Sequence, residues 1–360
     1  MKKFLSIILL IVFLLLSSLN VSCTNKGGNL SFTCFNTMVY VQTDDKAISS
    51  STQKALKSTF ESLERDFSLS VPTSFTSLFN TLAIDEEMEI TDTVKTVLKK
   101  CKGYYQFTDG KFNPAIKKLV KLWQFDNSSI NSQTFVPPAQ NDIDNILNGK
   151  TDFSMLVLDE STNKVIKKAD IEVDFGGIVK GYASEKALEI LKKAGHKKGY
   201  VSVGSSSIAI LSADSLGIRH PRNTNSLCLT VNTKNLKDVH VSTSGDYEKY
   251  HIYENKRYSH IIDPDTGKPA DTGIASTTVI CSDGGFSDAV TTALCTLSHT
   301  PSDNCSPVID LMNDIAKQYT DAHIYVIYIK DGTKQLLTNK MQGVDFTLHD
   351  TEIEIISISN

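Results

Sequence analysis

Hydrophobic residues recur along this 360-residue chain at two spacings, which mark helices and strands. Intervals of three and four residues predict helices, whereas alternating or short continuous hydrophobic runs predict strands. Few strict strand–helix–strand repeats occur, so the pattern indicates an α+β fold, with mixed, mainly antiparallel sheets flanked by helices. The predicted helices are 52–67, 91–104, 115–122, 142–147, 178–194 and 288–297. The predicted strands are 37–42, 153–158, 165–168, 171–175, 227–231, 239–242, 256–262, 275–281 and 323–329, and residues 199–211 are predicted as strands broken by Gly204 and three serines.

No repeat or low-complexity linker divides these elements, so we expect one large domain over residues 31–345. Residues 346–360 are then a C-terminal tail or an edge strand. The hydrophobic content of 40% is sufficient for a large core. The net charge of −4 gives no sign of a nucleic-acid partner. None of the seven cysteines forms a C-x-x-C pair, which argues against a zinc ribbon. Disulfide bridges are possible in an exported protein, but a buried free thiol is the alternative, so we assign no pairing.

The first residues predict export. Two lysines are followed by an apolar run over residues 4–16, which is shorter than the roughly 20 residues of a membrane-spanning helix. We therefore expect a signal peptide over residues 1–22. Cys23 after Ser22 resembles a bacterial lipoprotein processing site, although Asn20 stands where leucine is typical. The alternative is an ordinary signal peptide with an incidental cysteine. We expect lipidation of Cys23, a tether over residues 23–30, and a membrane-anchored protein that faces the periplasm.

The segment Asp174–Ala183 places a carboxylate, two glycines and Lys180 at the junction between a predicted strand and a predicted helix. Glycines allow a ligand to approach the backbone, and the free N–H groups of a first helical turn favour an anion such as phosphate. The alternative is a tight turn that binds no ligand.

A histidine precedes a tight-turn sequence in the segment His260–Ala270. The turn runs over Asp263–Gly267, where the proline and glycine suit the backbone angles of a tight turn. An imidazole at this place is a candidate general base near neutral pH. The alternative is a structural histidine that stabilises the turn.

Hard oxygen ligands share one helix face near residue 288. Asp288, Thr291 and Thr292 stand at positions i, i+3 and i+4. One carboxylate with hydroxyl groups suits magnesium, which keeps other positions for phosphate and water. The alternative is ordinary helix capping, with the threonines bonded to the preceding turn.

Taken in order, these three segments resemble the FAD:protein FMN transferases, the ApbE-type flavin transferases. Asp174–Ala183 is similar to the family pattern D-x-G-G-x-x-K-G-Y-A, His260–Pro269 to H-I-x-D-P-x-T-G-x-P, and Asp288–Thr292 to D-A-x-x-T. Residues 108–125 and 241–248 match further family segments, so the resemblance covers nearly the whole mature chain.

The chain departs from the family pattern at three places. Asn113 stands where the family usually has aspartate. Phe35 and Asn36 replace a methionine and a glycine, and Gly204-Ser205 replaces a glycine pair. These departures concern the packing of the flavin rather than His260 or Asp288.

The resemblance implies that FAD is a substrate and that Mg²⁺ is required. The FMN half is transferred to a threonine or serine hydroxyl of an acceptor protein, and AMP is released. It assigns the general base to His260, and the metal ligands to Asp288, Thr291, Thr292 and the Gly177 carbonyl. It assigns contacts with FAD to Phe35, Ser70, Asn113, Pro114, Ala115, Asp174, Lys180 and Ile262.

The implied acceptors are subunits of membrane redox pumps or exported electron carriers that display a threonine in an Asp-Gly-Ala-Thr-like motif. Two other functions are compatible with the same residues. One is an FAD pyrophosphatase that yields FMN and AMP, and the other is a non-catalytic FAD-binding lipoprotein.

Overall fold

The computed structural model describes residues 27–126, 135–223, 225–299 and 306–358. The expected signal peptide and Cys23 lie outside the described residues. Within the described part of the chain, no helix combines the length and apolar character that a membrane span requires. The five cysteines in that part are all buried free thiols, whereas Cys305 lies outside it.

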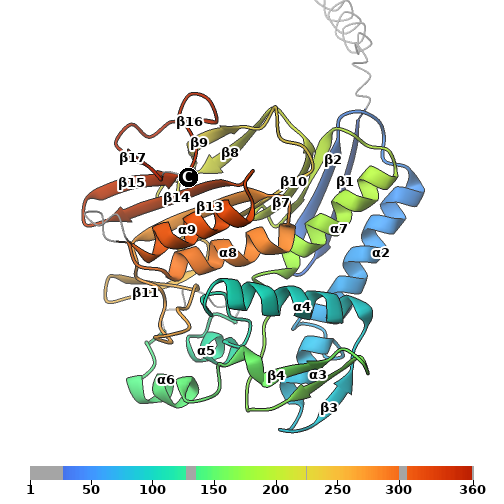
Figure 1. Ribbon diagram of the computed structural model, residues 1–360, viewed down its shortest axis with the longest axis vertical. Coiled ribbons are helices and arrows are strands. Elements are labelled where there is room, and N and C mark those ends of the chain that lie inside the picture. Colours follow the sequence, from blue (N-terminus) through green and yellow to red (C-terminus); the bar gives the residue numbers. More distant parts are fainter. Residues whose placement is uncertain (1–26, 127–134, 224, 300–305, 359–360) are drawn as a thin grey trace, which may run out of the picture.

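A nine-stranded sheet organises the molecule (Figure 1). Every neighbouring pair is antiparallel except the last, in which β17 runs parallel to β15. This arrangement, flanked by helices, confirms the predicted α+β fold with mainly antiparallel strands. In spatial order the strands are β1 (Gly28–Cys34), β2 (Thr37–Thr43), β6 (Gly199–Val203), β7 (Ser207–Ser212), β10 (Val239–Gly245), β13 (Ile274–Cys281), β14 (His323–Lys330), β15 (Thr333–Thr338) and β17 (Glu354–Ser357).

The sheet begins before the expected start of the domain at residue 31, and it includes an edge strand in the C-terminal segment, as one of the two expected alternatives had it. Gly28 is already paired with Thr43 of β2, so residues 28–30 belong to the sheet and not to the expected tether. The backbone hydrogen bonds of β1 outweigh its mixed polar composition, which had suggested a linker. At the other end, β17 forms the edge of the sheet within the segment 346–360.

Helices cover one face of this sheet (Figure 1). The helices α7 (Val179–Lys193) and α8 (Gly284–Thr296) pack directly on the strands, and α2 (Ser50–Phe67) packs on α7. Helix α4 (Asp92–Phe107) crosses the beginning of α8, and α9 (Pro307–Gln318) lies alongside α8.

A second, three-stranded sheet covers part of the other face. It consists of β8 (Ser215–Arg219), β9 (Leu227–Asn232) and β16 (Phe346–Leu348). Because β13 is covered on both faces, every one of its residues is buried, including the polar residues Ser276, Thr277 and Thr278.

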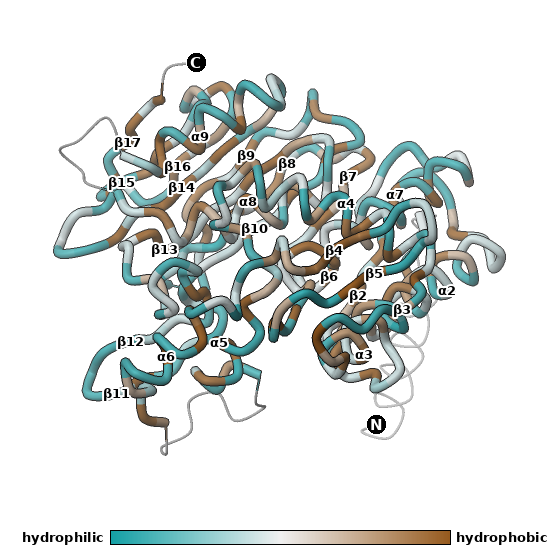
Figure 2. The backbone as a smooth tube through the Cα atoms, turned by 60° about the horizontal axis from the view of Figure 1, so that its bottom comes forward, coloured by the Kyte–Doolittle hydropathy of each residue, from teal (hydrophilic) through white to brown (hydrophobic). Residues whose placement is uncertain are grey.

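A smaller aromatic lobe lies beside the helical layer, where α5 (Lys117–Leu122) and α6 (Gln140–Leu147) meet the hairpin of β11 (Tyr250–Tyr253) and β12 (Lys256–Ser259) (Figure 2). Trp123 is buried at its centre, stacks on Tyr258, and donates its Nε1–H to the Gly267 carbonyl at 2.8 Å. The lobe thereby holds the turn that follows His260. The remaining elements are α3 (Phe75–Thr81), β3 (Glu87–Glu89), β4 (Leu156–Asp159), β5 (Lys164–Lys167) and a 3₁₀ turn at Phe153–Met155.

The strand predicted over 171–175 is wrong. Its alternate residues are buried as in a strand, but the backbone forms only one bridge, between Ile116 and Glu172. The side-chain amide of Asn80 takes the place of a neighbouring strand at Val173. Its Nδ2 donates to the Val173 carbonyl at 2.9 Å, and its Oδ1 accepts from the Val173 N–H at 2.7 Å. This contact fixes the segment that leads into Asp174.

Candidate functional site

The turn at Asp174 lies against the segment Asn113–Ala115. The Asp174 N–H donates to the Pro114 carbonyl at 2.8 Å, which joins two stretches that are 60 residues apart in the sequence. Asp174 Oδ1 accepts from the Gly176 N–H at 2.8 Å, so this oxygen shapes the turn. Oδ2 takes no part in that bond and remains available to a ligand.

The amide of Asn113 is occupied within its own loop. Its Nδ2 donates to the Thr151 carbonyl and its Oδ1 accepts from the Ala115 N–H, both at 2.8 Å. The side chains of Pro114 and Ala115 are buried. Of these three expected flavin contacts, only Asn113 presents a partly exposed side chain, so the other two contribute mainly by shaping the backbone.

Helix α7 begins without a side-chain cap. Its N-cap residue is Ile178, whose side chain makes no capping hydrogen bond. The Val179 N–H donates to the Phe175 carbonyl at 3.0 Å and the Gly181 N–H donates to Asp288 Oδ2, which leaves the Lys180 N–H of the first turn to meet an anion. Lys180 reaches back over this end, and its Nζ donates to the Gly176 carbonyl at 3.0 Å. Gly177 has no left-handed backbone. Gly177 matters because it lies close to α8: a Cβ at this residue would stand 3.7 Å from Thr292 Oγ1.

The backbones of α7 and α8 touch at Gly181 and Gly284. A Cβ on Gly181 would lie 2.0 Å from the Gly284 carbonyl oxygen, which no side chain can tolerate. This approach lets Asp288 Oδ2 accept from the Gly181 N–H at 3.0 Å, while Oδ1 accepts from the Ser207 hydroxyl at 3.1 Å. The Asp288 carboxylate is only 4% exposed and is therefore held in one orientation.

Two threonines follow Asp288 with different surroundings. The Thr291 hydroxyl is fully buried, donates to backbone carbonyls of its own helix, and accepts from the Ser244 hydroxyl at 3.0 Å. Thr292 is partly exposed, and its Oγ1 lies 3.3 Å from the Asp288 carbonyl and on the side of Gly177. Of the two, Thr292 is the better placed to meet an ion.

Asp288, Thr292 and the Gly177 backbone fit a magnesium ion by their chemistry. One carboxylate, one hydroxyl and one backbone carbonyl are all hard oxygen donors, and such a set leaves positions for water and phosphate. In the described residues, no group of three histidine, cysteine, aspartate or glutamate side chains could hold a metal. This part of the chain thus offers no richer site of the zinc type.

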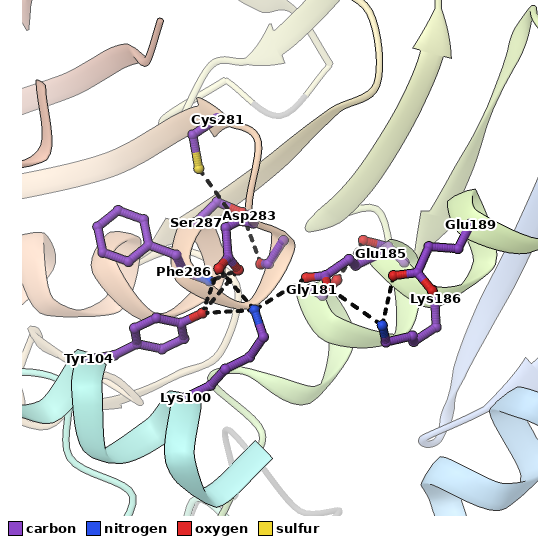
Figure 3. Close-up of polar contacts among 12 residues, drawn as sticks. Lys100, Tyr104, Gly181, Glu185, Lys186, Glu189, Cys281, Asp283, Phe286 and Ser287 are labelled. Atoms are coloured by element: carbon purple, nitrogen blue, oxygen red, sulfur yellow. Dashed lines mark hydrogen bonds and ion pairs between the residues drawn. The ribbon is translucent and has the colours of Figure 1, made fainter. Parts of the chain in front are cut away.

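Helix α8 begins at Gly284, four residues before the predicted start at Asp288. Asp283 is the N-cap and accepts from the Phe286 N–H, so neither Ser287 nor Asp288 caps this helix. Figure 3 shows Lys100 and Tyr104 of α4 reaching this carboxylate, each at 2.9 Å. Burial alone would raise the pKa of Asp283, but the Lys100 charge and these hydrogen bonds hold it below its ordinary value.

Sequence reasoning missed this anchor of α8. Lys100 and Asp283 are 183 residues apart, and each has an ordinary local role as a helix-surface lysine or a capping aspartate. The contact sets where α8 starts, and with it where Asp288 and Thr292 lie.

His260 is half-buried, with its ring edge near Phe125. Its backbone N–H donates to the Lys249 carbonyl, and its Nδ1 lies 3.0 Å from the same oxygen. Burial first, and then the positive charges of Lys249 and Lys180, lower the pKa of His260 to about 4. The imidazole is therefore neutral at pH 7, with the Lys180 charge as a lesser contribution to the lowered pKa.

Three further expected flavin contacts, Ile262, Phe35 and Ser70, have no direct contact with Asp288 or His260 among the described hydrogen bonds. Ile262 is 2% exposed within the aromatic lobe. Phe35 lies in the tight turn between β1 and β2, and Asn36 of that turn donates to the Ser70 hydroxyl at 2.8 Å. The structure therefore brings Phe35 and Ser70 into one neighbourhood. Left-handed backbone at Phe35 and Asn36 explains why glycine is expected in such a turn.

A cavity outside this centre lies in the same part of the molecule as the turn after His260. It has a volume of about 570 Å³ and lies between α6 and the turn after His260. Four carboxylates line it, and only one lysine does. Such a surface repels a pyrophosphate, which agrees with placing the phosphates at the α7–α8 junction. The charged lining residues are Asp144, Asp263, Asp265, Lys268 and Asp271.

Comparisons with known proteins agree on one family. The ApbE family model matches residues 33–304. The FAD:protein FMN transferase of Klebsiella pneumoniae (strain 342) is 33% identical over 192 residues, which cover 52% of this chain and 56% of that protein. The one from Treponema pallidum (strain Nichols) is 27% identical over 227 residues, which cover 57% and 60%. The chain thus spans about half the length of the curated relatives it matches.

Solved structures show the same architecture. The ApbE protein of Thermotoga maritima superposes with a TM-score of 0.72 at 25% identity, covering 84% of this chain and 94% of that one. The apo flavinyl transferase ApbE of Pseudomonas stutzeri superposes with a TM-score of 0.71 at 21% identity, covering 87% and 94%, which is a likeness of fold. The family model covers three quarters of the sequence, and the chain therefore belongs to the ApbE family.

Proposed function

We propose that this protein transfers FMN from FAD to a threonine or serine hydroxyl of an acceptor protein, with Mg²⁺, and releases AMP. The observation that carries the proposal is one convergence. Three features come together at the start of α7. Gly177 lies next to Thr292, which stands on the same helix as the oriented carboxylate of Asp288, and the charge of Lys180 contributes to keeping the His260 imidazole neutral. Family membership and the names of the relatives support it.

The residues at the start of α7 are suited to hold a dinucleotide. The backbone N–H and the ammonium of Lys180 attract the pyrophosphate, and Asp174 Oδ2 offers an acceptor to another part of FAD. Asp288, Thr292 and the Gly177 carbonyl would hold Mg²⁺, and the buried hydroxyl of Thr291 contacts the Ser244 hydroxyl, which also meets Thr292. When bound, the ion neutralises pyrophosphate oxygens and so favours attack on phosphorus.

His260 acts on the acceptor. Its Nε2 removes the proton from the acceptor hydroxyl as that oxygen attacks the phosphorus of the FMN half. A new oxygen–phosphorus bond forms, and the bond from this phosphorus to the bridging oxygen breaks. AMP leaves with the bridging oxygen. The product is FMN joined to the acceptor through a phosphodiester, and the histidine carries the proton until it returns to water.

The site must meet its acceptor outside the cytoplasm. The apolar start of the chain and Cys23 support an exported protein that is anchored through lipid and faces the periplasm. The acceptor is then a membrane redox-pump subunit or an exported electron carrier. Labelling with a radioactive fatty acid would test the anchor, since Cys23→Ala should abolish incorporation.

Mass spectrometry tests the reaction. The purified protein is mixed with FAD, Mg²⁺ and an acceptor domain that carries the threonine motif. We expect the acceptor to gain the mass of FMN less one water, together with an equal amount of AMP. FMN and AMP released while the acceptor remains unmodified would identify a pyrophosphatase instead. FAD that is bound but never cleaved would identify a non-catalytic binding protein.

A further inference from the structure

Lys117, the first residue of α5, is a largely buried lysine whose ammonium forms only two long ion pairs among the described residues. The residue is 5% exposed. Its Nζ lies 3.6 Å from Asp126 Oδ2 and 4.0 Å from Asp174 Oδ2, both beyond hydrogen-bonding distance. In the described parts of the chain, no closer acceptor meets it. The ammonium therefore keeps donor capacity for a further hydrogen bond.

The neighbouring lysines of α5 behave differently. Lys118 and Lys121 each lie 2.6 Å from a carboxylate oxygen, of Asp170 and Glu172 respectively. The helix therefore pairs two of its lysines directly and leaves the ammonium of Lys117 with long contacts only.

The backbone fixes Lys117 beside Asp174. The Lys117 N–H donates to the Glu172 carbonyl at 3.3 Å, and three residues earlier the Pro114 carbonyl accepts from the Asp174 N–H. Asp174 Oδ1 is used by the Gly176 N–H, and Oδ2 is the oxygen that lies nearest the ammonium. A donor and an acceptor thus stand side by side at the place where FAD contacts are expected.

We propose that Lys117 binds FAD, with its ammonium and Asp174 Oδ2 together recognising the edge of one ring system. Both rings of FAD offer the complementary pair, an acceptor next to an N–H donor. The flavin has a carbonyl beside its ring N–H, and the adenine has a ring nitrogen beside its amino group. A phosphate is disfavoured here because two carboxylates flank the ammonium. The inference rests on the proposed function, which makes FAD the substrate.

FAD titrations of the full chain test this proposal through the quenching of flavin fluorescence. Lys117→Met should raise Kd about tenfold, because tenfold corresponds to about 1.4 kcal/mol, the scale of a charge-assisted hydrogen bond. Lys121→Met is the matched control on the same helix, and its Kd should stay at the parent value. Unchanged affinity in Lys117→Met would overturn the proposal.

A second variant separates binding from simple charge neutralisation. Lys117→Arg keeps the positive charge that Asp126 and Asp174 require but moves the donors away from the ring edge. We expect weaker FAD binding in a folded protein, whether or not Lys117→Met folds. Parent affinity in Lys117→Arg would show that the charge alone matters and would refute the ring contact.

Fragments of the substrate identify the ring. FMN losing affinity for the variants assigns the contact to the flavin, and ADP losing affinity assigns it to the adenine. If neither fragment loses affinity, the proposal fails. A parent protein that transfers FMN while its Lys117 variants bind FAD normally would reject only this inference. A parent protein that transfers nothing while its variants lose FAD affinity would reject only the proposed function.

Discussion

The backbone carbonyl of Lys249 faces two nitrogens of His260, the backbone N–H and Nδ1, each at 3.0 Å. A carbonyl oxygen only accepts, so the imidazole proton resides on Nδ1 and Nε2 is left as the free base. The same residue that fixes this tautomer also contributes a positive charge that lowers the pKa. His260 is thus held in the form that a general base needs.

The pH profile of transfer should reflect this environment. With a pKa of about 4 in place of 6.5, His260 stays neutral from pH 7 down to about pH 5 and gains its proton only below that. We expect kcat/KM to stay constant over that range and to fall towards pH 4. Replacing a neighbouring charge by Lys249→Met should move the acid limb upward. An acid limb near 6.5 in the parent would contradict the assignment.

Removing the imidazole should separate chemistry from binding. His260→Ala takes away the proton acceptor, and general-base catalysis is typically worth a factor of about 10² to 10⁴. We expect transfer to fall by at least about a hundredfold while the Kd for FAD changes little. The acceptor mass assay and fluorescence titration measure the two effects. Full modification of the acceptor by this variant would exclude histidine from the mechanism.

The metal assignment predicts a change in magnesium dependence. Asp288→Ala removes the one carboxylate of the set, so half-saturation should require much more Mg²⁺. Ser207→Ala removes only the hydroxyl that orients Asp288 Oδ1, so its titration curve should shift less in the same direction. Transfer rates measured against Mg²⁺ concentration compare the three proteins. Coincident curves for Asp288→Ala and parent would show that the ligand is wrongly assigned.

Two glycine substitutions probe how α7 meets α8. Gly181→Ala would drive its Cβ into the Gly284 carbonyl, and such overpacking typically costs ~1–3 kcal/mol or more. Gly103→Ala, in the exposed interior of α4, meets nothing within 4 Å and should gain ~0.5–1 kcal/mol from helix propensity. Urea unfolding measures both. Equal stability of Gly181→Ala and parent would mean that the helices separate easily at this point.

Local pattern predicted the elements whose burial is regular. The helices at 52–67 and 91–104 were predicted almost to their ends because each buries one face at helical spacing. The strand predicted at 171–175 failed because burial alternates there without a partner strand, and Asn80, more than 90 residues away, supplies the hydrogen bonds. The prediction for residues 28–30 was also wrong, because this segment was expected to be a tether. Its backbone pairs with β2 at the edge of the sheet in spite of its polar residues.

For the candidate site, too, local pattern was predictable and contacts between distant residues were not. The order of motifs along the chain was sufficient to name the family, and the i, i+3, i+4 spacing was sufficient to place Asp288 and Thr292 on one helix face. Neither could reveal that Gly181 lets the two helices touch, or that Lys117 lies beside Asp174.

The amino-acid sequence by itself determined the helices and strands with regular burial, and which chemical groups the site contains, because periodicity and residue type are local properties. The tertiary structure alone decided which of those groups meet. Orientation of the Asp288 carboxylate, the tautomer of His260 and the start of α8 each depend on hydrogen bonds between residues distant in the chain. Such contacts form only once the sheet and its helices have packed.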